Sequence, residues 1–158
     1  MIPSNVGSID YIIANFMRRK GIVALRYSLA LIFIWFGLLK PLGISPAEQL
    51  VRATVYWLPV FSIDTWVSLI GWWEVLIGIT FLFKKTLRLA IALLALQMIG
   101  TFMPLVMLPE VSFQNGHIPY GLTMEGQYII KNLLIISAAL VIGGTVRSRN
   151  QPINIVGD

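Results

Sequence analysis

Glu74 is the residue of this chain whose position most strongly indicates chemistry, because it lies within an apolar run from Thr65 to Phe83. That run of 19 residues is long enough to cross a bilayer, since about 20 residues at roughly 1.5 Å each match the hydrocarbon thickness. A carboxylate near the middle of such a span costs at least about 2.5 kcal/mol on insertion scales. We therefore expect Glu74 to have a partner. The pair is then either part of a ligand or ion site, or a structural ion pair that only fixes helix packing.

Lys131 and Arg26 lie in other apolar segments and are the first candidates for that partner. The helical rise places Glu74 roughly 13 Å and Lys131 roughly 8 Å below the outer ends of their spans, a difference that a lysine side chain can cover. Arg26 lies near the cytoplasmic end of its span, where an arginine can extend to the lipid headgroups. We therefore expect Glu74–Lys131 to be the closer pair, with Arg26 as the second choice.

Helical spacing predicts one stripe of small and polar residues on each apolar segment. Small residues let helices approach closely and polar residues avoid lipid, so these stripes should face the interior of a bundle. Their members are Arg26, Ala30, Phe33, Gly37 and Lys40 in the first segment, Gly71, Glu74 and Gly78 in the second, Gln97, Gly100, Thr101 and Pro104 in the third, and Gln127, Lys131 and Ala138 in the fourth. Pro104 should kink the third span.

Three further residues have both a functional and a plain interpretation. Trp73 is either packing or the wall of a pocket for a flat hydrophobic ligand. His117, in a polar outer loop, is either a solvated histidine or part of a proton-sensitive site with Glu125 or Glu110. Glu125 also fits the first turn of the fourth span, where the helix dipole favours an anion, with Thr123 as the N-cap.

The composition identifies an integral membrane protein. Of the 158 residues, 57% are hydrophobic and only 12% are charged, against about 25% charged in soluble domains. The length fits one domain. The chain has no Cys, which excludes disulfide and thiol chemistry. Its single His argues against a metal centre built from this chain alone, because catalytic zinc sites use about three protein ligands.

Apolar runs at about 22–40, 65–83, 88–108 and 127–145 predict an all-α integral membrane four-helix bundle. Lys and Arg gather on one side of these runs, as Arg18, Arg19, Lys20, Lys84, Lys85, Arg88, Arg147 and Arg149, and only Lys40 and Arg52 lie on the other. The positive-inside rule therefore predicts cytoplasmic termini. The net charge of +5 then serves topology and binding of anionic lipid, and we expect no nucleic-acid partner.

Two short segments outside the spans are predicted to be helical. Residues 9–20 carry apolar side chains at helical spacing and end in Arg-Arg-Lys, which is typical of a helix lying on the cytoplasmic leaflet. Ser45-Pro-Ala-Glu48 resembles a capping box that starts a helix over the outer mouth of the bundle, ending at Pro59. We therefore divide the chain into a cytoplasmic interfacial segment (1–20), a four-pass transmembrane domain (21–146) and a cytoplasmic tail (147–158).

Three sequence elements resemble the DoxX-like superfamily, and within it the YkgB/RclC-like branch. They are the first-helix segment from Arg26 to Lys40, the second-helix Gly71-Trp-Trp-Glu74 followed by Gly78, and the fourth-helix Gly126-Gln-Tyr-Ile-Ile-Lys131-Asn132. In the last element Gln127 and Asn132 stand where the branch has Arg and Asp. The resemblance covers about residues 20–145. It implies a four-helix bundle in the bacterial inner membrane and treats the Glu74–Lys131 pair as a family feature. It also adds Asn132 to the candidate ligand-binding or buried charge cluster, whose other members are Glu74, Lys131, Arg26, Gln97, Lys40 and Trp73.

Because relatives include a membrane subunit of a thiosulfate:quinone oxidoreductase and proteins of oxidative-stress defence, the resemblance implies a non-catalytic membrane subunit or accessory protein in redox physiology. A quinone or another lipophilic molecule near Glu74 is the expected ligand; the expected partners are membrane lipids, an oxidoreductase or other membrane protein, and a second copy of the chain. A small-solute or proton transporter is the first alternative, and a membrane assembly or interaction factor is the second. The sequence contains no nucleophile–base pair or phosphate loop that would support an enzyme acting alone.

Overall fold

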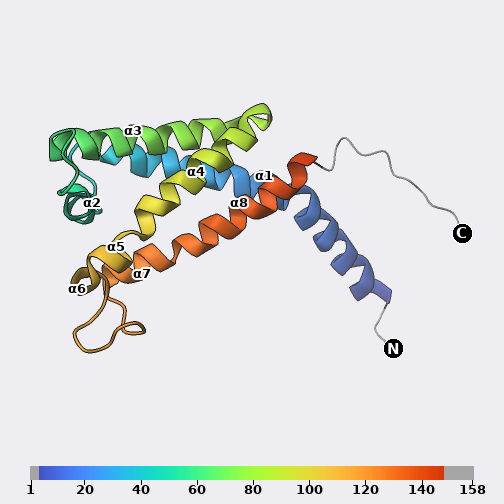
Figure 1. Cartoon of the computed structure of the whole chain (residues 1–158). Helices are drawn as coiled ribbons and strands as arrows, with labels where there is room; N and C mark the ends of the chain where they lie inside the picture. The colour runs from blue at the N-terminus through green and yellow to red at the C-terminus, as the bar shows by residue number, and fades with distance from the viewer. Residues whose placement is uncertain (1–3, 148–158) are drawn as a thin grey trace, which may run out of the picture.

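The computed structural model describes residues 4–147, which form helices joined by turns and one isolated bridge between Phe113 and Leu122 (Figure 1). Four helices or helix pairs in this part of the chain are long and apolar enough to cross a membrane: Ile9–Leu39, Ile63–Leu82, Lys84–Met107 and Met124–Val146. The predicted all-α, four-span architecture is thereby confirmed. Most of the predicted tail, including Arg149, lies outside the described residues.

Helices α1 (Ser4–Leu39) and α3 (Ile63–Leu82) form the most extensively packed pair of the fold. They run antiparallel, so that Gly37 faces Gly71 and Ala30 faces Gly78. This register places Arg26 level with Leu82, the last residue of α3. The stripes predicted for the first two spans are confirmed, because Arg26, Ala30, Phe33, Gly37, Lys40, Gly71 and Gly78 are all buried.

The third and fourth spans are each made of two helical pieces. The third comprises α4 (Leu87–Phe102), preceded by the 3₁₀ turn η1 (Lys84–Thr86), and the short α5 (Pro104–Met107). Pro104 begins α5. Because proline has no backbone N–H to continue the hydrogen bonds of α4, the span is interrupted at this residue, as predicted. The fourth comprises α7 (Met124–Ile130) and α8 (Asn132–Arg147), which meet at Lys131.

The core lies where α1, α3, α4 and α8 converge, and Ile77, Phe81, Leu94 and Ile142 are its largest members with almost no exposed surface. Between 17% and 39% of the residues in the best apolar window of each span are buried within the monomer. Most side chains of the spans therefore face outward, to lipid or to other membrane helices.

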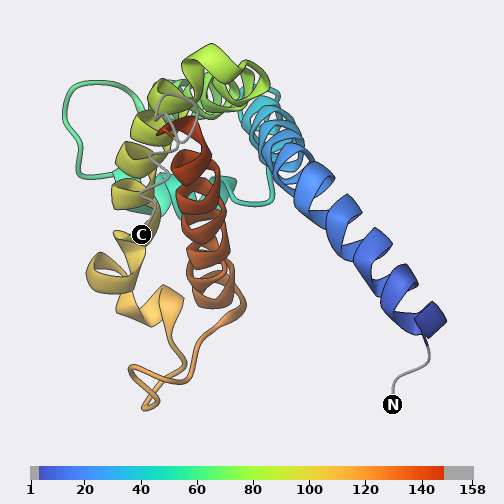
Figure 2. The ribbon, with the colours of Figure 1, turned by 90° about the vertical axis from the view of Figure 1, so that its right-hand side faces the viewer.

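The first part of α1 extends past the rest of the bundle, as Figures 1 and 2 show. From Ser4 to Gly21 it adds about 27 Å of helix at 1.5 Å per residue, and Leu25 already packs against the core. The separate interfacial helix predicted for residues 9–20 is thus wrong in one respect: it is continuous with the first span. Gly21 has open space around it and no proline follows, so nothing at this point breaks the helix. The apolar side chains predicted to face lipid are exposed, among them Ile9, Ile12, Ile13, Phe16 and Met17.

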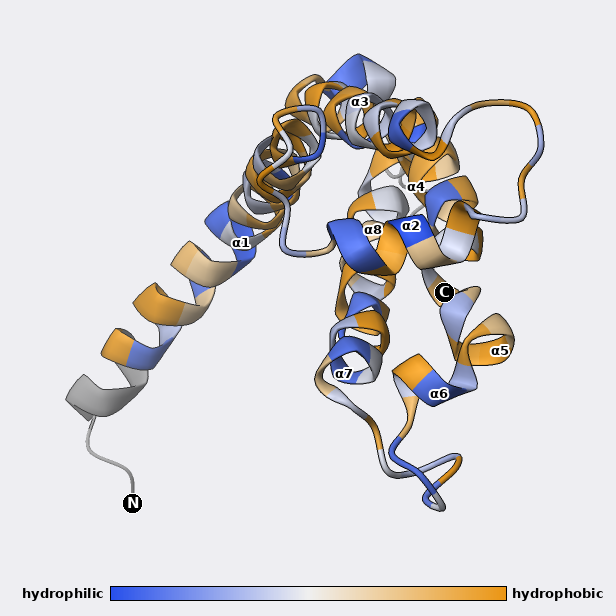
Figure 3. Cartoon of the chain, turned by 90° about the vertical axis from the view of Figure 1, so that its left-hand side faces the viewer, coloured by the Kyte–Doolittle hydropathy of each residue, from blue (hydrophilic) through white to orange (hydrophobic). Residues whose placement is uncertain are grey.

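On the side predicted to lie outside, α2 (Glu48–Val55) lies across the end of the bundle, in front of α4 and α8 in Figure 3, and contacts α3 and α5. The predicted outer helix is present, but it begins at Glu48 after a turn. The capping box is wrong, because Ser45 offers its backbone oxygen to Glu48 N and no side chain caps the helix. Glu48 instead accepts a hydrogen bond from Arg52 at 2.8 Å.

The loop between the third and fourth spans, which the sequence predicts to lie outside, is held by close contacts at its two ends. It contains α6 (Pro109–Ser112), and buried Ser112 donates its hydroxyl to Pro104 O at 3.0 Å. Thr123 caps α7 by accepting from Gly126 N, with Glu125 in the first turn, as predicted. The Thr123 hydroxyl also donates to Val111 O at 2.6 Å. Gly126 packs so closely that a Cβ there would lie 2.0 Å from Ser112 O.

Candidate functional site

Glu74 is held by two side chains from neighbouring helices. Lys40 Nζ donates to Glu74 Oε2 at 2.5 Å, and Gln97 Nε2 donates to Glu74 Oε1 at 3.2 Å. The side chain of Lys40 is 6% exposed and that of Glu74 is 14% exposed, so the ion pair is almost fully buried within the protein. We call Lys40, Glu74 and Gln97 the charge cluster. It joins α1, α3 and α4 at one point.

Two glycines allow the ion pair to form. A Cβ on Gly71 would lie 2.7 Å from Gly37 O and 2.8 Å from Lys40 Cβ, and a Cβ on Gly37 would meet Gly71 O at 2.7 Å. No side chain fits between the two backbones at this crossing. The helices therefore approach closely enough for the base of Lys40 to lie directly against α3.

The end of α1 sets the depth of Lys40. The helix finishes at Leu39, and its last carbonyls are bonded by the turn that follows, with Gly43 N donating to Lys40 O at 3.0 Å and Ile44 N to Leu39 O at 3.1 Å. Gly43 has φ +70°, a left-handed conformation that ends helices and suits glycine. Because α3 continues for about two further turns above Gly71, Lys40 lies inside the bundle beside Gly71, and its side chain reaches down α3 to Glu74.

An ionic link fastens α2 above the charge cluster. Arg52 Nη2 contacts Asp64 Oδ1 at 2.5 Å at the start of α3, and the same atom lies 2.8 Å from Glu48 Oε1 within α2. The Arg52 and Asp64 side chains are 39% and 79% exposed, so water screens this link. The link between Arg52 and Asp64 therefore adds little stability, and its main effect is to hold α2 across the end of the bundle.

The predicted Glu74–Lys131 ion pair is wrong. Lys131 is exposed at the junction of α7 and α8, with Nζ 5.1 Å from the ring centroid of Tyr128. The fourth span faces the core with Ile129, Ala138, Ala139 and Ile142, so the predicted stripe is confirmed at Ala138 and wrong at Gln127 and Lys131, which are exposed. Depth estimates alone could not reveal this, because they ignore the rotation of a helix about its axis.

Arg26 is buried, with 6% of its surface exposed, but it lies level with the end of α3, well away from Glu74 along the helix axis, and forms no ion pair or hydrogen bond with the charge cluster. Its Nε has no hydrogen-bond partner among the described residues, and its guanidinium carbon lies 4.8 Å from the centroid of the Tyr27 ring. A buried guanidinium nitrogen without a partner costs free energy. Arg26 is therefore separate from Glu74, and the charge cluster does not account for the burial of its guanidinium.

The remaining candidates are dispersed. Asn132 donates to Tyr128 O at 2.9 Å and Ile129 O at 3.1 Å, so it caps the end of α7. Trp73 is half-buried and packs against the core. His117 and Glu125 are both exposed, and His117 Nδ1 bonds the backbone oxygen of Asn115 at 2.9 Å. The helix-capping hydrogen bonds of Asn132 and the core packing of Trp73 account for these two residues without a ligand.

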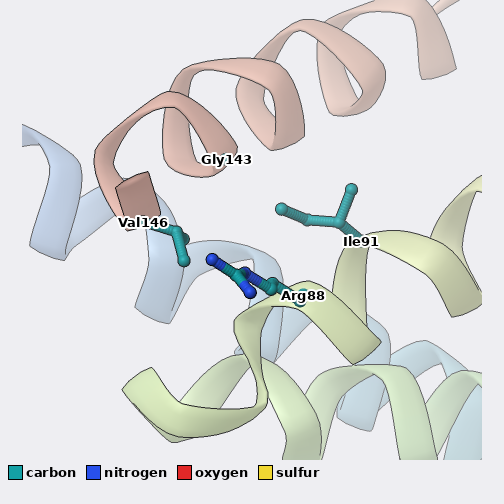
Figure 4. Close-up of a pocket in the computed structure, with 4 residues that line it drawn as sticks. All are labelled: Arg88, Ile91, Gly143 and Val146. Atoms are coloured by element: carbon teal, nitrogen blue, oxygen red, sulfur yellow. The ribbon is translucent and has the colours of Figure 1, made fainter. Parts of the chain in front are cut away.

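A recess of about 340 Å³ lies away from the charge cluster, between the start of α4 and the end of α8 (Figure 4). Arg88 and Ile91 line it from α4, and Gly143 and Val146 line it from α8. Within the described chain, no group of three or more His, Asp or Glu residues is arranged to hold a metal ion. No protein-family model, no curated protein and no solved structure matches this chain.

Proposed function

We propose that this protein is a non-catalytic membrane subunit or accessory protein that binds the polar head of a lipophilic molecule, a quinone by preference, at the charge cluster. The observation that carries the proposal is the arrangement around Glu74, where a lysine and an amide from two other helices converge on one carboxylate. Lys40 Nζ has three N–H groups and Glu74 accepts one of them, so donors remain for a carbonyl oxygen.

The surroundings of the charge cluster favour a ligand that arrives from lipid. Gln97 is only half-buried, so part of its side chain can be reached from outside the bundle. A flat ring with two carbonyl groups could accept hydrogen bonds from Gln97 and Lys40, with half-buried Trp73 nearby on α3. The resemblance to DoxX-like proteins supports the same choice, as well as the bacterial inner membrane and a role in redox or oxidative-stress physiology.

The low burial of the spans supports the role of a subunit. With no more than 39% of any apolar window buried, large apolar side chains such as Trp35 and Trp72 remain exposed. Lipid can cover them, and so can the helices of a partner oxidoreductase or a second copy. This same observation favours the second candidate function, an assembly or interaction factor that acts through these faces and the outer loop without binding a ligand.

Ligand retention tests the proposal. The protein is extracted in mild detergent, its bound lipids are identified by mass spectrometry, and decylubiquinone is titrated into the delipidated protein. We expect a copurifying quinone and saturable decylubiquinone binding, and we expect Gln97→Leu and Glu74→Gln to weaken both at least tenfold. Glu110→Gln, an exposed carboxylate in the outer loop, is the matched control.

Two results would count against a ligand site. Absence of quinone in the extract together with no saturable decylubiquinone binding would overturn it. Equal binding by folded Gln97→Leu and wild type would place any quinone elsewhere. If an oxidoreductase nevertheless copurifies, the assembly role replaces the ligand-binding role.

A further inference from the structure

The recess between α4 and α8 combines one charged wall with apolar walls. In Figure 4 the side chains of Arg88 and Ile91 extend from α4 into the space toward α8, where Val146 and Gly143 form the opposite side. The space of about 340 Å³ opens at the end of the bundle that also holds the turn between α3 and α4. A ligand held here would meet a guanidinium at one end and aliphatic carbon along its length.

Two further cations precede Arg88 closely in the chain. Lys84 and Lys85 form the turn that leads into α4, and both are exposed, as is Arg88. None of these three forms an ion pair with a carboxylate among the described residues. The acidic residues Glu48, Asp64, Glu110 and Glu125 all lie on the outer side, and Asp10 lies on the projecting part of α1.

The depth of these cations suits a lipid headgroup. Leu82 is the last residue of the second candidate span, so the turn at Lys84 and Lys85 marks its cytoplasmic boundary. The register of α1 against α3 places Arg26 at the same level, and Arg26 is buried with its Nε lacking a hydrogen-bond partner. Four cations therefore share the depth at which the phosphate groups of the inner leaflet lie.

We propose that this recess is a binding site for an anionic phospholipid. Arg88 binds the phosphate, with Lys84 and Lys85 contributing at the rim, and the acyl chain lies along Ile91 and Gly143 toward the bilayer. A guanidinium can form two parallel hydrogen bonds to phosphate oxygens, and this favours Arg88 as the principal contact. The apolar walls favour a lipid over free phosphate.

Gly143 provides the room for the acyl chain. A Cβ at this position would lie 3.1 Å from Ile91 Cδ1, whereas a Cβ on the adjacent Gly144 would have nothing within 4 Å. A larger side chain at Gly143 therefore fills the recess, and the same side chain at Gly144 projects outward without touching it. The two neighbouring glycines offer a matched pair of variants.

The experiment uses the full-length protein, delipidated in detergent and then mixed with phosphatidylglycerol or phosphatidylcholine of equal acyl length, with retained lipid counted by native mass spectrometry. We expect phosphatidylglycerol to be retained preferentially. Arg88→Gln should weaken it about fivefold, and the triple change of Lys84, Lys85 and Arg88 to Gln roughly a hundredfold. Gly143→Leu should abolish the preference, and Gly144→Leu should keep it.

Three results would overturn the site: equal retention of the two lipids by wild type, unchanged retention in Arg88→Gln, or displacement of phosphatidylglycerol by millimolar inorganic phosphate. If Gly143→Leu fails to fold, Arg88→Gln and Ile91→Phe carry the test, because Arg88 is exposed and Phe fills the recess from the other wall. Gln97→Leu, which keeps the Lys40–Glu74 ion pair, should bind phosphatidylglycerol as wild type does, so this site and the charge cluster succeed or fail separately.

Discussion

Lys40 and Glu74 are 34 positions apart in the chain, yet they form an ion pair that depends on the backbone contact between Gly37 and Gly71. The pair lies at the crossing of α1 and α3, the most extensively packed helices of the fold. Gln97 adds a contact from α4 to the same carboxylate. Glu74 thus links three of the four spans through its contacts with Lys40 and Gln97.

Removing one member of this pair should destabilise the protein more than removing both. Lys40→Met leaves Glu74 buried without a counter-ion, which costs about 3 kcal/mol for a buried pair. Lys40→Met with Glu74→Met replaces the pair by apolar side chains of similar size, so most of that loss should be recovered. Unfolding in detergent, followed by circular dichroism over the four combinations, measures the coupling free energy.

The exposed ionic link is the control for that cycle. Arg52→Gln and Asp64→Asn remove a solvent-screened contact, so their coupling should be clearly smaller than that of Lys40 and Glu74. Equal coupling in the two cycles would mean that the buried pair contributes no more than a surface contact.

Side chains larger than hydrogen should not be tolerated at the α1–α3 crossing. A Cβ on Gly78 would lie 2.6 Å from Ile34 Cγ1 and 2.7 Å from Ala30 O, so Gly78→Ala must move the two helices apart. We expect a loss of about 1–3 kcal/mol, the usual cost of overpacking. Thermal unfolding of the purified variant measures it.

Gly100→Ala is the matched control, because it lies within α4 and a Cβ there has nothing within 4 Å. Alanine is the better helix former by about 1 kcal/mol, so this variant should be as stable as wild type or more so. The two substitutions are chemically identical, yet Gly78→Ala should lower the stability of the protein and Gly100→Ala should not. Destabilisation by both would contradict the packing explanation.

The fold was largely predictable from the sequence because membrane spans are specified by long apolar runs, and the first two stripes by glycine at helical spacing. Burial of Arg26, Gly37, Gly71 and Gly78 follows from that periodicity. The continuity of α1 past Gly21 was not predictable, since a composition change at residue 20 looks the same whether or not the helix breaks.

The partner of Glu74 was not predictable, for two physical reasons. Lys40 falls at the end of an apolar run, which predicts a position at the outer boundary. However, α1 ends about two turns below the start of α3, so the Lys40 side chain can reach Glu74. Lys131 has a suitable depth but lies on the wrong side of its helix. A helix's rotation and shift along its axis come from packing against its neighbours, and a single sequence carries little of that information.

The outer loop should lose its structure when Gly126 is changed. A Cβ on Gly126 would lie 2.0 Å from Ser112 O, so Gly126→Ala must separate α7 from α6 and weaken the hydrogen bond from Thr123 N to Ser112 O. We expect hydrogen exchange to rise at least tenfold across residues 109–123 while α1 and α3 remain protected. Gly144→Ala, which has open space around it, should leave the exchange pattern unchanged. Protection of the loop in Gly126→Ala would contradict the close contact.

The predicted orientation can be tested directly, because the chain has no Cys and any introduced thiol is unique. Asn115→Cys, in the exposed outer loop, should react with a membrane-impermeant maleimide in intact cells, and Lys84→Cys should react only after the membrane is opened. Positive charge on the side of Lys84 and Lys85 is the physical reason.

Phe16→Cys, on the projecting part of α1, distinguishes two positions for that segment. A slow reaction even in opened membranes would indicate that this part of α1 lies in the headgroup region, as its exposed apolar side chains favour. Rapid labelling there would place it in water, and labelling of Asn115→Cys only after opening would reverse the whole topology.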